Sequence, residues 1–364
     1  MPLVAHSNLP AFERLREDGQ EVLNADRAKQ QDIRELHIGL LNMMPDAALQ
    51  ATERQFLRLI GSCNHIAQFY VHLFTIGGIE RQGETKTHVE RYYEDFRQLQ
   101  QDGLDALIIT GANPAHDDIT QEPYWDPMAD VLAWGREHVC SIVCSCLATH
   151  ADLKLYHNIE RIRLPQKRWG VYSHRLLEHK HPLVSNINTR FDAPHSHFNE
   201  VTREQVEAAG LTVLAYSEQA DVHLVVSPDQ FRLIYFQGHP EYDINSLLKE
   251  YKRELDRFIN DERPDYPPYP ENYFAPKAIA ILEEHKRQVE SAKSAGKTIP
   301  RLPEKRLHEY VDNTWTDTGK AMFNNWLGLI YQLTNRDRKQ PFMAGVDPHN
   351  PLGLRNRRRL AGSG

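Results

Sequence analysis

Residues 141–151 read SIVCSCLATHA, and this stretch predicts a strand, a sharp turn and a helix. The mostly apolar run 141–145 is typical of a buried strand, Cys146 falls at the turn, and a helical pattern follows from Leu147. A cysteine at such a turn stands at the end of a sheet beside a helix N-terminus, where the helix dipole favours a thiolate. The arrangement matches the nucleophile elbow of strand–turn–helix enzymes, with sulfur in place of oxygen. We therefore predict that Cys146 is a nucleophile.

The composition is that of an ordinary globular chain. Its 364 residues are 40% hydrophobic and 26% charged, which is enough for one large α/β domain or two smaller ones. The formal net charge is −7, so the chain has no overall excess of basic residues of the kind that binds nucleic acid. We find no apolar run of about 18 residues, so we expect no membrane span.

The N-terminus and the cysteines indicate the compartment. Residues 1–24 mix charges and lack an apolar core, so we expect no signal peptide. Of the four cysteines, three cluster between residues 140 and 146, which does not make a disulfide framework. We therefore expect a protein of the reducing cytoplasm.

The first half of the chain alternates apolar runs with helical patterns. Near-continuous apolar runs such as Leu36–Asn42 are typical of strands buried on both faces. The predicted strands are 36–42, 67–76, 104–110 and 141–145, and the predicted helices are 47–60, 87–100, 127–137 and 147–157. This rhythm predicts an α/β fold, with a mostly parallel sheet flanked by helices.

The second half predicts shorter strands and then long helices. The strands are 169–175, 211–216, 223–227 and 231–237, and the helices are 244–260, 275–295 and 316–333, with a proline-rich loop over 261–270. We therefore divide the chain into a polar N-terminal arm with one short helix (1–34), one α/β domain with a helical C-terminal extension (35–335) and a basic, disordered tail (336–364).

A histidine with an acidic neighbour is the second candidate for catalysis. His239 follows a buried strand, where binding residues collect in open α/β sheets, and Glu241 is placed to orient its ring. A thiol activated by such a histidine is the minimal unit of acyl transfer. His150 is the alternative base because it follows Cys146 by four residues, but the cysteine lies outside regular helix. We favour His239 and interpret His150 as a supporting or packing residue.

We expect no metal site and no disulfide around the nucleophile. Cys140, Cys144, Cys146 and His150 lie in or beside one strand without a second C-x-x-C pair, which does not match the spacing of zinc ligands. Cys144 and Cys146 are too close in sequence to meet disulfide geometry well.

Three polar stretches suit a small charged substrate. Lys167 and Arg168 precede a predicted strand, and residues 193–197 are interpreted as an ordered loop that presents a hydroxyl and two imidazoles. Arg253 lies on the helix after His239, about three turns along. Together these side chains favour a substrate with a carboxylate, which arginine binds through two hydrogen bonds.

Several motifs follow one another in the order found in a known family. They are Leu41–Pro45, Thr52–Arg58, Ile109–Ala112 with Tyr124-Trp125, the Cys146 segment, Gly170–Tyr172, Ala193–Ser196, Gly238–Asp243 and Asn324–Leu327. On these motifs, which run from about residue 36 to 335, the sequence resembles the homoserine O-acyltransferases of methionine biosynthesis, of the homoserine O-succinyltransferase type. The resemblance implies a fold similar to class I glutamine amidotransferases.

The resemblance also implies ping-pong acyl transfer, with acyl-CoA as a cosubstrate and no bound cofactor. Acyl-CoA acylates Cys146 and CoA leaves. His239, oriented by Glu241, then deprotonates the hydroxyl of an amino acid, which attacks the thioester. The amide of Leu147 is the expected oxyanion donor.

The family's substrate residues carry over by position. Its lysine, serine and arginine that bind the amino acid match Lys167, Ser196 and Arg253. The position matching Ala115 influences the acyl donor, because glycine there goes with succinyl-CoA and glutamate with acetyl-CoA. Alanine is small and uncharged and leaves room for a second carboxylate. We therefore favour succinyl-CoA and L-homoserine as substrates.

Other substrates and other classes are the alternatives. Acetyl-CoA is the second donor and serine the second acceptor, since one methylene gives only about 1–3 kcal/mol of discrimination. An amidotransferase-like thiol hydrolase would use water as the acyl acceptor in place of an amino acid. A binding module without enzymatic activity would not need Cys146, His239 and Glu241. The chain departs from the family at Leu147, usually tryptophan, and at His150, usually glutamine. Family members are commonly dimers, so we expect a homodimer with no nucleic-acid partner.

Overall fold

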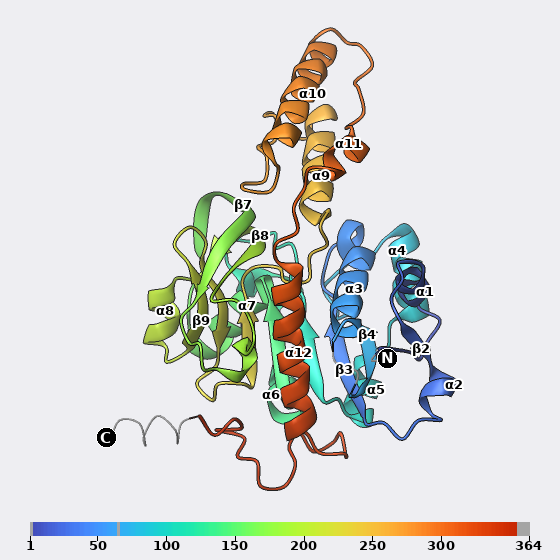
Figure 1. The fold of residues 1–364 in the computed structure, drawn as a ribbon, viewed down its shortest axis with the longest axis vertical. Helices are drawn as coiled ribbons and strands as arrows, with labels where there is room; N and C mark the ends of the chain where they lie inside the picture. The colour runs from blue at the N-terminus through green and yellow to red at the C-terminus, as the bar shows by residue number, and fades with distance from the viewer. Residues whose placement is uncertain (1–2, 64–65, 355–364) are drawn as a thin grey trace.

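One mixed sheet runs through the described part of the chain. The structure, a computed structural model, describes residues 3–63 and 66–354, and the arginines at 357–359 of the predicted tail lie outside these ranges. Eleven strands form the sheet in the order β2-β1-β4-β3-β5-β6-β11-β10-β9-β7-β8 (Figure 1). They are β1 (Leu3–Ala5), β2 (Val22–Asn24), β3 (Glu35–Leu41), β4 (Gln68–Phe74), β5 (Ala106–Ile109), β6 (Ser141–Ser145), β7 (Ile162–Leu176), β8 (Arg190–Glu200), β9 (Thr212–Ser217), β10 (Asp221–Val226) and β11 (Leu233–Phe236).

The sheet has a parallel half and an antiparallel half. From β2 to β11 every neighbouring pair is parallel, whereas β10, β9, β7 and β8 add antiparallel strands beyond β11. All four residues of β5 and all five of β6 are buried, as both faces of such strands are covered. The prediction of a mostly parallel sheet in an α/β fold is confirmed.

Helices cover both faces of the sheet. They are α1 (Pro10–Glu17), α2 (Ala25–Ala28), α3 (Asp46–Gly61), α4 (Gly83–Tyr92), α5 (Phe96–Asp102), α6 (Trp125–His138), α7 (Leu147–His157), α8 (Arg203–Ala208), α9 (Ser246–Ile259), α10 (Pro276–Ser294), α11 (Glu304–His308) and α12 (Thr316–Leu333), with short 3-10 turns at Ile119–Gln121 and Pro182–Val184. Helices α1, α3 and α12 contribute to the core on one face. Helices α5, α6, α7 and α8 contribute to the core on the other face.

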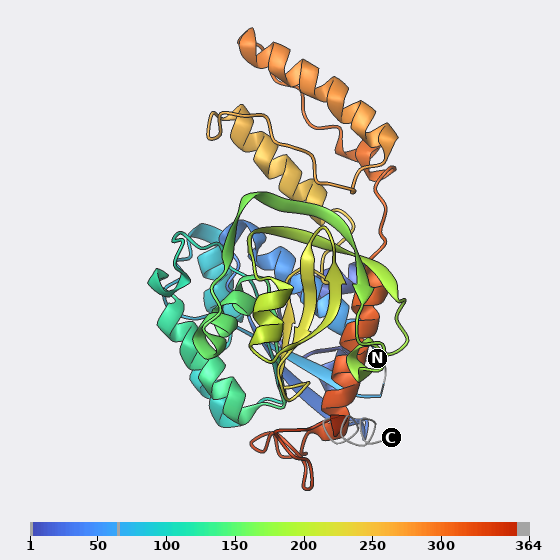
Figure 2. The same ribbon diagram turned by 90° about the vertical axis from the view of Figure 1, so that its left-hand side faces the viewer.

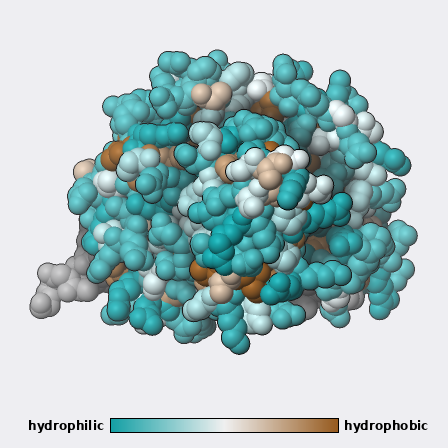
Figure 3. Space-filling view, turned by 90° about the horizontal axis from the view of Figure 1, so that it is seen from above, coloured by the Kyte–Doolittle hydropathy of each residue, from teal (hydrophilic) through white to brown (hydrophobic). Residues whose placement is uncertain are grey.

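Helices α9, α10 and α11 form a cap, residues 246–308, that projects beyond the sheet (Figures 1 and 2). The cap has its own apolar cluster, which includes Leu247, Tyr251 and Leu282 and reaches the sheet through Trp169 of β7. Seen from above, its surface is largely hydrophilic (Figure 3). No helix within the described ranges combines the length and apolarity that a membrane crossing requires.

The N-terminal residues belong to the sheet. Residues 3–24, expected as part of a polar arm, contribute β1 and β2 at its edge, and β1 pairs with β4 through Leu3 and Phe69. The expected short helix is α1, which packs Phe12 and Leu15 into the core. The apolar residues of β1 are too few to predict a strand from the sequence. They form one because β4, which is distant in sequence, pairs with them. The domain boundaries themselves stay a prediction.

Two local expectations were wrong. The helix predicted over 87–100 is two helices, because the backbone of Tyr93 is extended and the amide of Glu94 donates to the carbonyl of Leu73 at 2.7 Å. Asp95 then caps α5 by accepting from the amide of Gln98. The loop predicted over 193–197 is part of β8, which pairs along β7.

We expect Trp326→Ala to lower the free energy of unfolding by about 3–5 kcal/mol, the usual cost of removing a buried aromatic side chain. The Trp326 indole is 2% exposed, and its Nε1 donates to Oγ of Ser141 at 3.0 Å. Gln332→Ala, at an exposed position of the same helix, is the control and should change stability by less than about 0.5 kcal/mol. Urea denaturation measures both, and equal effects would contradict the packing of α12 described here.

Candidate active site

Cys146 occupies the sharp turn between β6 and α7. Both elements have the predicted bounds, 141–145 and 147–157. Cys146 has φ 52° and ψ −106°, a conformation that costs energy for a residue with a side chain. Its amide donates to the carbonyl of Phe236 at 2.7 Å, and its carbonyl accepts from the amide of Thr149 at 3.1 Å. These bonds hold the strained turn at the carboxyl end of the sheet.

His239 leaves the neighbouring strand at the same edge. Strand β11 pairs in parallel with β6, and Phe236 lies opposite Ser145. The amide of His239 donates to the carbonyl of Pro194 at 2.8 Å. Gly238 permits this approach, because a Cβ there would lie 2.8 Å from the same carbonyl oxygen. The turn after β11 is therefore fixed against β8.

Glu241 and Tyr242 hold the ring of His239. Nδ1 of His239 donates to Oε1 of Glu241 at 2.8 Å, and both side chains are buried. Tyr242 stacks on the imidazole with a centroid separation of 4.3 Å. Burial opposes charge on His239, but the charge of Glu241 and the hydrogen bonds with Cys146 and Glu241 raise its pKa to about 10. The surroundings of the imidazole therefore favour its protonated form.

The hydrogen bond between His239 and Cys146 pairs the imidazole with the thiol. A protonated imidazole stabilises a neighbouring thiolate, and the N-terminal end of α7 adds a favourable dipole. Cys63, Cys140 and Cys144 are free and buried, and burial raises the pKa of each thiol. Of the four cysteines, Cys146 is the one placed to react.

The space beside the thiol is kept open by a glycine. Leu147 is the first residue of α7, so its amide has no acceptor within the helix. A Cβ built on Gly111, which follows β5, would lie 3.5 Å from Cβ of Cys146 and 3.8 Å from the nitrogen of Leu147. The missing side chain leaves room for a small group next to both. The role of the Leu147 amide as an oxyanion donor stays a prediction.

A buried carboxylate, Glu250 of α9, gathers the polar side chains next to the triad. It accepts from Nζ of Lys167 at 3.0 Å, from Oγ of Ser196 at 2.6 Å and from the hydroxyl of Tyr242 at 2.7 Å. Burial opposes its charge, but Lys167 and these hydrogen bonds hold the pKa of Glu250 below its usual value. Tyr242 thus links the His239 ring to this second cluster.

Sequence reasoning missed Glu250, although a signal existed. The buried face of α9 carries Leu247, Leu248, Tyr251 and Leu255, and Glu250 interrupts this apolar stripe. A charged residue on the apolar face of an amphipathic helix needs a partner in the interior.

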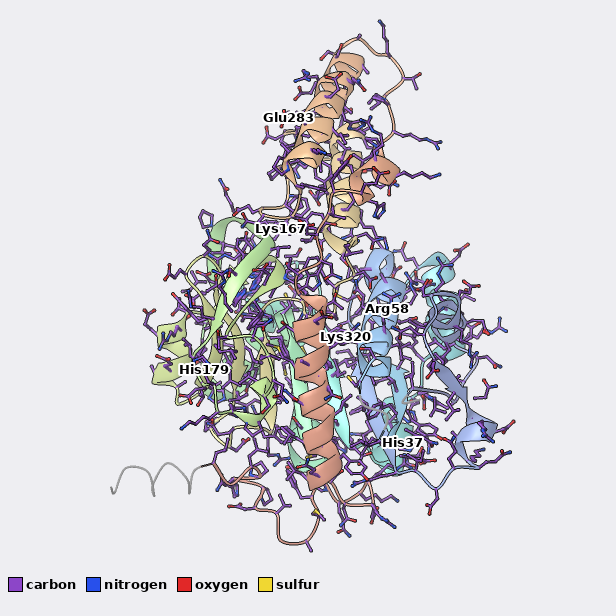
Figure 4. All side chains as sticks on the ribbon, viewed as in Figure 1. His37, Arg58, Lys167, His179, Glu283 and Lys320 are labelled. Atoms are coloured by element: carbon purple, nitrogen blue, oxygen red, sulfur yellow. The ribbon has the colours of Figure 1, made fainter. Side chains whose placement is uncertain are left out.

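The other predicted site residues lie nearby or further out. Lys167 of β7 and Ser196 of β8 meet at Glu250, and Figure 4 labels Lys167 where the sheet approaches the cap. Arg253 follows Glu250 by three residues on α9 and is exposed. Ala115 is exposed in the connection after β5. The roles predicted for Arg253 and Ala115 stay predictions.

His150 lies in the interior of α7. It is 3% exposed, and burial together with the charge of Arg161 lowers its pKa to about 3. His150 is therefore neutral, and the imidazole that hydrogen bonds with Cys146 is His239. This favours the interpretation of His150 as a packing residue.

A thiol at a strand–helix turn, beside a buried histidine–glutamate pair at the edge of a parallel sheet, is the arrangement of α/β proteins with a cysteine nucleophile. The family model described as homoserine O-succinyltransferase matches residues 2–336. The chain belongs to the homoserine O-succinyltransferase family, which confirms the resemblance read from its motifs.

Relatives of this chain align over nearly its whole length. A homoserine O-succinyltransferase of Methylobacter tundripaludum is 60% identical, over 97% of this chain and 100% of the relative. Proteins of the same name from Methylococcus capsulatus and Nitrosococcus oceani are 58% and 59% identical, over 97% and 98% of this chain and 100% and 99% of their own. A solved glutamine amidotransferase from Thermotoga maritima aligns over 82% of this chain and 98% of its own, with a TM-score of 0.40 and 12% identity.

We expect iodoacetamide to alkylate Cys146 selectively, because this thiol is partly exposed and lies beside the His239 imidazole, while the other three thiols are buried. His239→Ala should slow this alkylation by about tenfold or more. His116→Ala, at an exposed histidine outside the triad, is the control. Peptide mass mapping gives the site and rate, and labelling of Cys140 or Cys144 before Cys146 would show that the assignment is wrong.

Proposed function

We propose that this chain transfers the succinyl group of succinyl-CoA to the hydroxyl of L-homoserine, giving O-succinyl-L-homoserine and CoA for methionine biosynthesis. The family match and the similarity to full-length relatives of that name support the proposal. The observation that carries it is the contact of Cys146, His239 and Glu241 at one edge of the sheet, because acyl transfer needs a nucleophile and a proton carrier in contact.

The first half-reaction forms a thioester on Cys146. The thiolate attacks the carbonyl carbon of succinyl-CoA, and the carbonyl oxygen takes up negative charge next to the amide of Leu147. The carbon–sulfur bond to CoA then breaks, and the CoA sulfur takes the proton of His239. The enzyme is left with an acylated cysteine and a neutral imidazole.

The second half-reaction returns the proton to His239. The neutral imidazole removes the proton of the homoserine hydroxyl as its oxygen attacks the thioester carbon. The bond to Cys146 breaks, so the thiolate and the imidazolium are regenerated together. Glu241 holds the ring through Nδ1, which leaves Nε2 for both proton transfers.

The acceptor binds at the Glu250 cluster. Homoserine carries an ammonium and a carboxylate, and the cluster offers an anion and cations close to His239. Glu250 receives the ammonium in a charge-assisted hydrogen bond. Lys167 and Arg253 attract the carboxylate, and Ser196, which donates to Glu250 at 2.6 Å, fixes the orientation of that side chain.

The donor preference rests on Ala115. A small neutral side chain leaves space for the second carboxylate of the succinyl group and repels it less than a glutamate would. We also propose a cytoplasmic homodimer that needs no bound cofactor.

Incubation with succinyl-CoA alone should leave a succinyl thioester on Cys146, detected by peptide mass spectrometry and released by homoserine. Cys146→Ala should form no adduct. In steady state the pair succinyl-CoA and homoserine should exceed serine or acetyl-CoA combinations, with homoserine preferred over serine by about 10–200-fold in kcat/KM. Release of the adduct by water as fast as by homoserine would identify a thiol hydrolase instead.

Glu250→Gln should raise the KM for homoserine by about tenfold or more, since loss of one charge-assisted hydrogen bond costs roughly 1.5–3 kcal/mol. Formation of the Cys146 adduct from succinyl-CoA should stay within about twofold of wild type, because Glu250 serves the second substrate. Glu254→Gln on the same helix, where Glu254 pairs with Arg257 and Arg263, is the matched control. A loss of adduct formation equal to the loss of turnover would assign Glu250 to the first half-reaction.

A further inference from the structure

A cluster of two histidines and a glutamate lies in the half of the sheet away from Cys146, since β3 and β5 separate β4 from β6. His6 follows β1, His72 lies in β4, and Glu94 lies between α4 and α5. One nitrogen or oxygen of each falls within 4.8 Å of the other two. Nδ1 of His72 is 2.9 Å and Nε2 of His6 is 3.6 Å from Oε1 of Glu94. Ligand atoms around a tetrahedral zinc ion lie roughly 3.3 Å apart, given bonds of about 2.0–2.1 Å.

The partners of His72 favour a lone pair on its Nδ1. Oε2 of Glu35 can only accept, so Nε2 of His37, which lies 3.4 Å from it, carries a proton. Nδ1 of the neutral His37 then accepts from Nε2 of His72 at 2.8 Å. This leaves Nδ1 of His72 with a lone pair that faces both oxygens of Glu94, at 2.9 and 3.0 Å. A metal ion between this nitrogen and the carboxylate would bind both groups.

The same reasoning holds for His6. Its Nδ1 lies 3.3 Å from the carbonyl oxygen of Val4, which can only accept, so this contact favours the tautomer with the proton on Nδ1. Nε2 of His6 therefore also presents a lone pair to Glu94. One metal ion placed among the three groups would bind both imidazoles and the carboxylate, because their ligand atoms all lie within 4.8 Å of one another. We propose that His6, His72 and Glu94 bind one divalent transition-metal ion of the zinc type.

The donor set and the surroundings suit such an ion. Two imidazoles and a carboxylate are zinc-type ligands, whereas calcium and magnesium prefer oxygen alone. Glu94 balances one positive charge, and Glu35 balances the other through His37, in the way outer carboxylates support metal-bound histidines. The side chains of His6, His72 and Glu94 are 16%, 12% and 39% exposed, so an ion and a completing water can enter from solvent.

A second group of converging histidines within the described residues, His174, His195 and His223, is less suited. All three are buried and the group includes no carboxylate. Nε2 of His195 can donate to Nε2 of His174 at 3.2 Å, and Nδ1 of His174 donates to the carbonyl of Tyr172 at 2.9 Å. Hydrogen bonds thus pair His174 and His195, whereas Nδ1 of His223 is buried without a hydrogen-bond partner among the described residues. The group is less suited to a divalent ion because it offers no carboxylate to balance the charge.

The ion would fasten the N-terminal strand. β1 is three residues long and pairs with β4 through one residue pair. An ion bound by His6, His72 and Glu94 together would tie the end of β1 both to β4 and to the connection between α4 and α5. The site is therefore structural, and its effect is on stability rather than on acyl transfer.

The test is zinc binding by the full chain without an affinity tag, after removal of metal with a chelator. Calorimetric titration should give one tightly bound zinc ion per chain, and cobalt should give the absorption of a tetrahedral site. His6→Gln and Glu94→Gln should each weaken binding by about tenfold or more, and His37→Gln by about 10–100-fold through loss of support for His72. His179→Gln is the control, and Figure 4 labels His37 and His179 on opposite sides of the molecule.

Thermal unfolding with and without zinc checks the same proposal by a second readout. Zinc should raise the melting temperature of the wild type and of His179→Gln, because it binds the native state. The rise should be absent in His6→Gln and Glu94→Gln, both of which replace partly exposed side chains. Unchanged zinc affinity in those two variants, or loss of zinc only on mutation of His174 or His223, would overturn the proposal. So would a wild type that binds no zinc.

Discussion

The parallel pairing of β6 with β11 is the constraint on which the active site depends. Neighbouring strands lie about 4.8 Å apart, and Phe236 lies opposite Ser145. The segments that follow β6 and β11 therefore leave the sheet side by side. The bond from the Cys146 amide to the Phe236 carbonyl extends this pairing one residue past β6. Because both faces of β6 are buried, a one-residue slip would move every side chain to the opposite packed face, where it does not fit, and is excluded. The distance between thiol and imidazole is thus set by the backbone of the sheet.

Much of the fold could be predicted from the sequence because its signals are local. Buried parallel strands such as β6 are short apolar runs, and the elbow and α7 follow from residues next to one another. β1, β8 and the break between α4 and α5 could not be predicted, since each depends on a distant partner. Three residues make a strand of β1 only because β2 and β4 are there. Residues 193–197 have the sequence of a loop, and they form part of a strand because they pair with β7.

The candidate site divides in the same way. Cys146, His239 and Glu241 could be predicted because strand ends and near neighbours mark them, and they do meet. Lys167 and Ser196 also come together, but through Glu250. In the sequence, Glu250 was not distinguished from the other charged residues of its helix. Its importance follows from burial and three donors, which are properties of the assembled fold. Arg253 is exposed, and sequence position alone does not say how it would reach a substrate.

The cap has a consequence for how such an enzyme can diversify. Glu250 stands on α9 of the cap, whereas Cys146 and His239 stand at the edge of the sheet, and Tyr242 bridges the two. Under the proposed function the acceptor site spans both parts, with Glu250 on the cap and Lys167 and Ser196 on the sheet. Residues 240–245 connect the reactive turn to α9. Drift in the cap can retune the choice of substrate while the reactive centre is conserved.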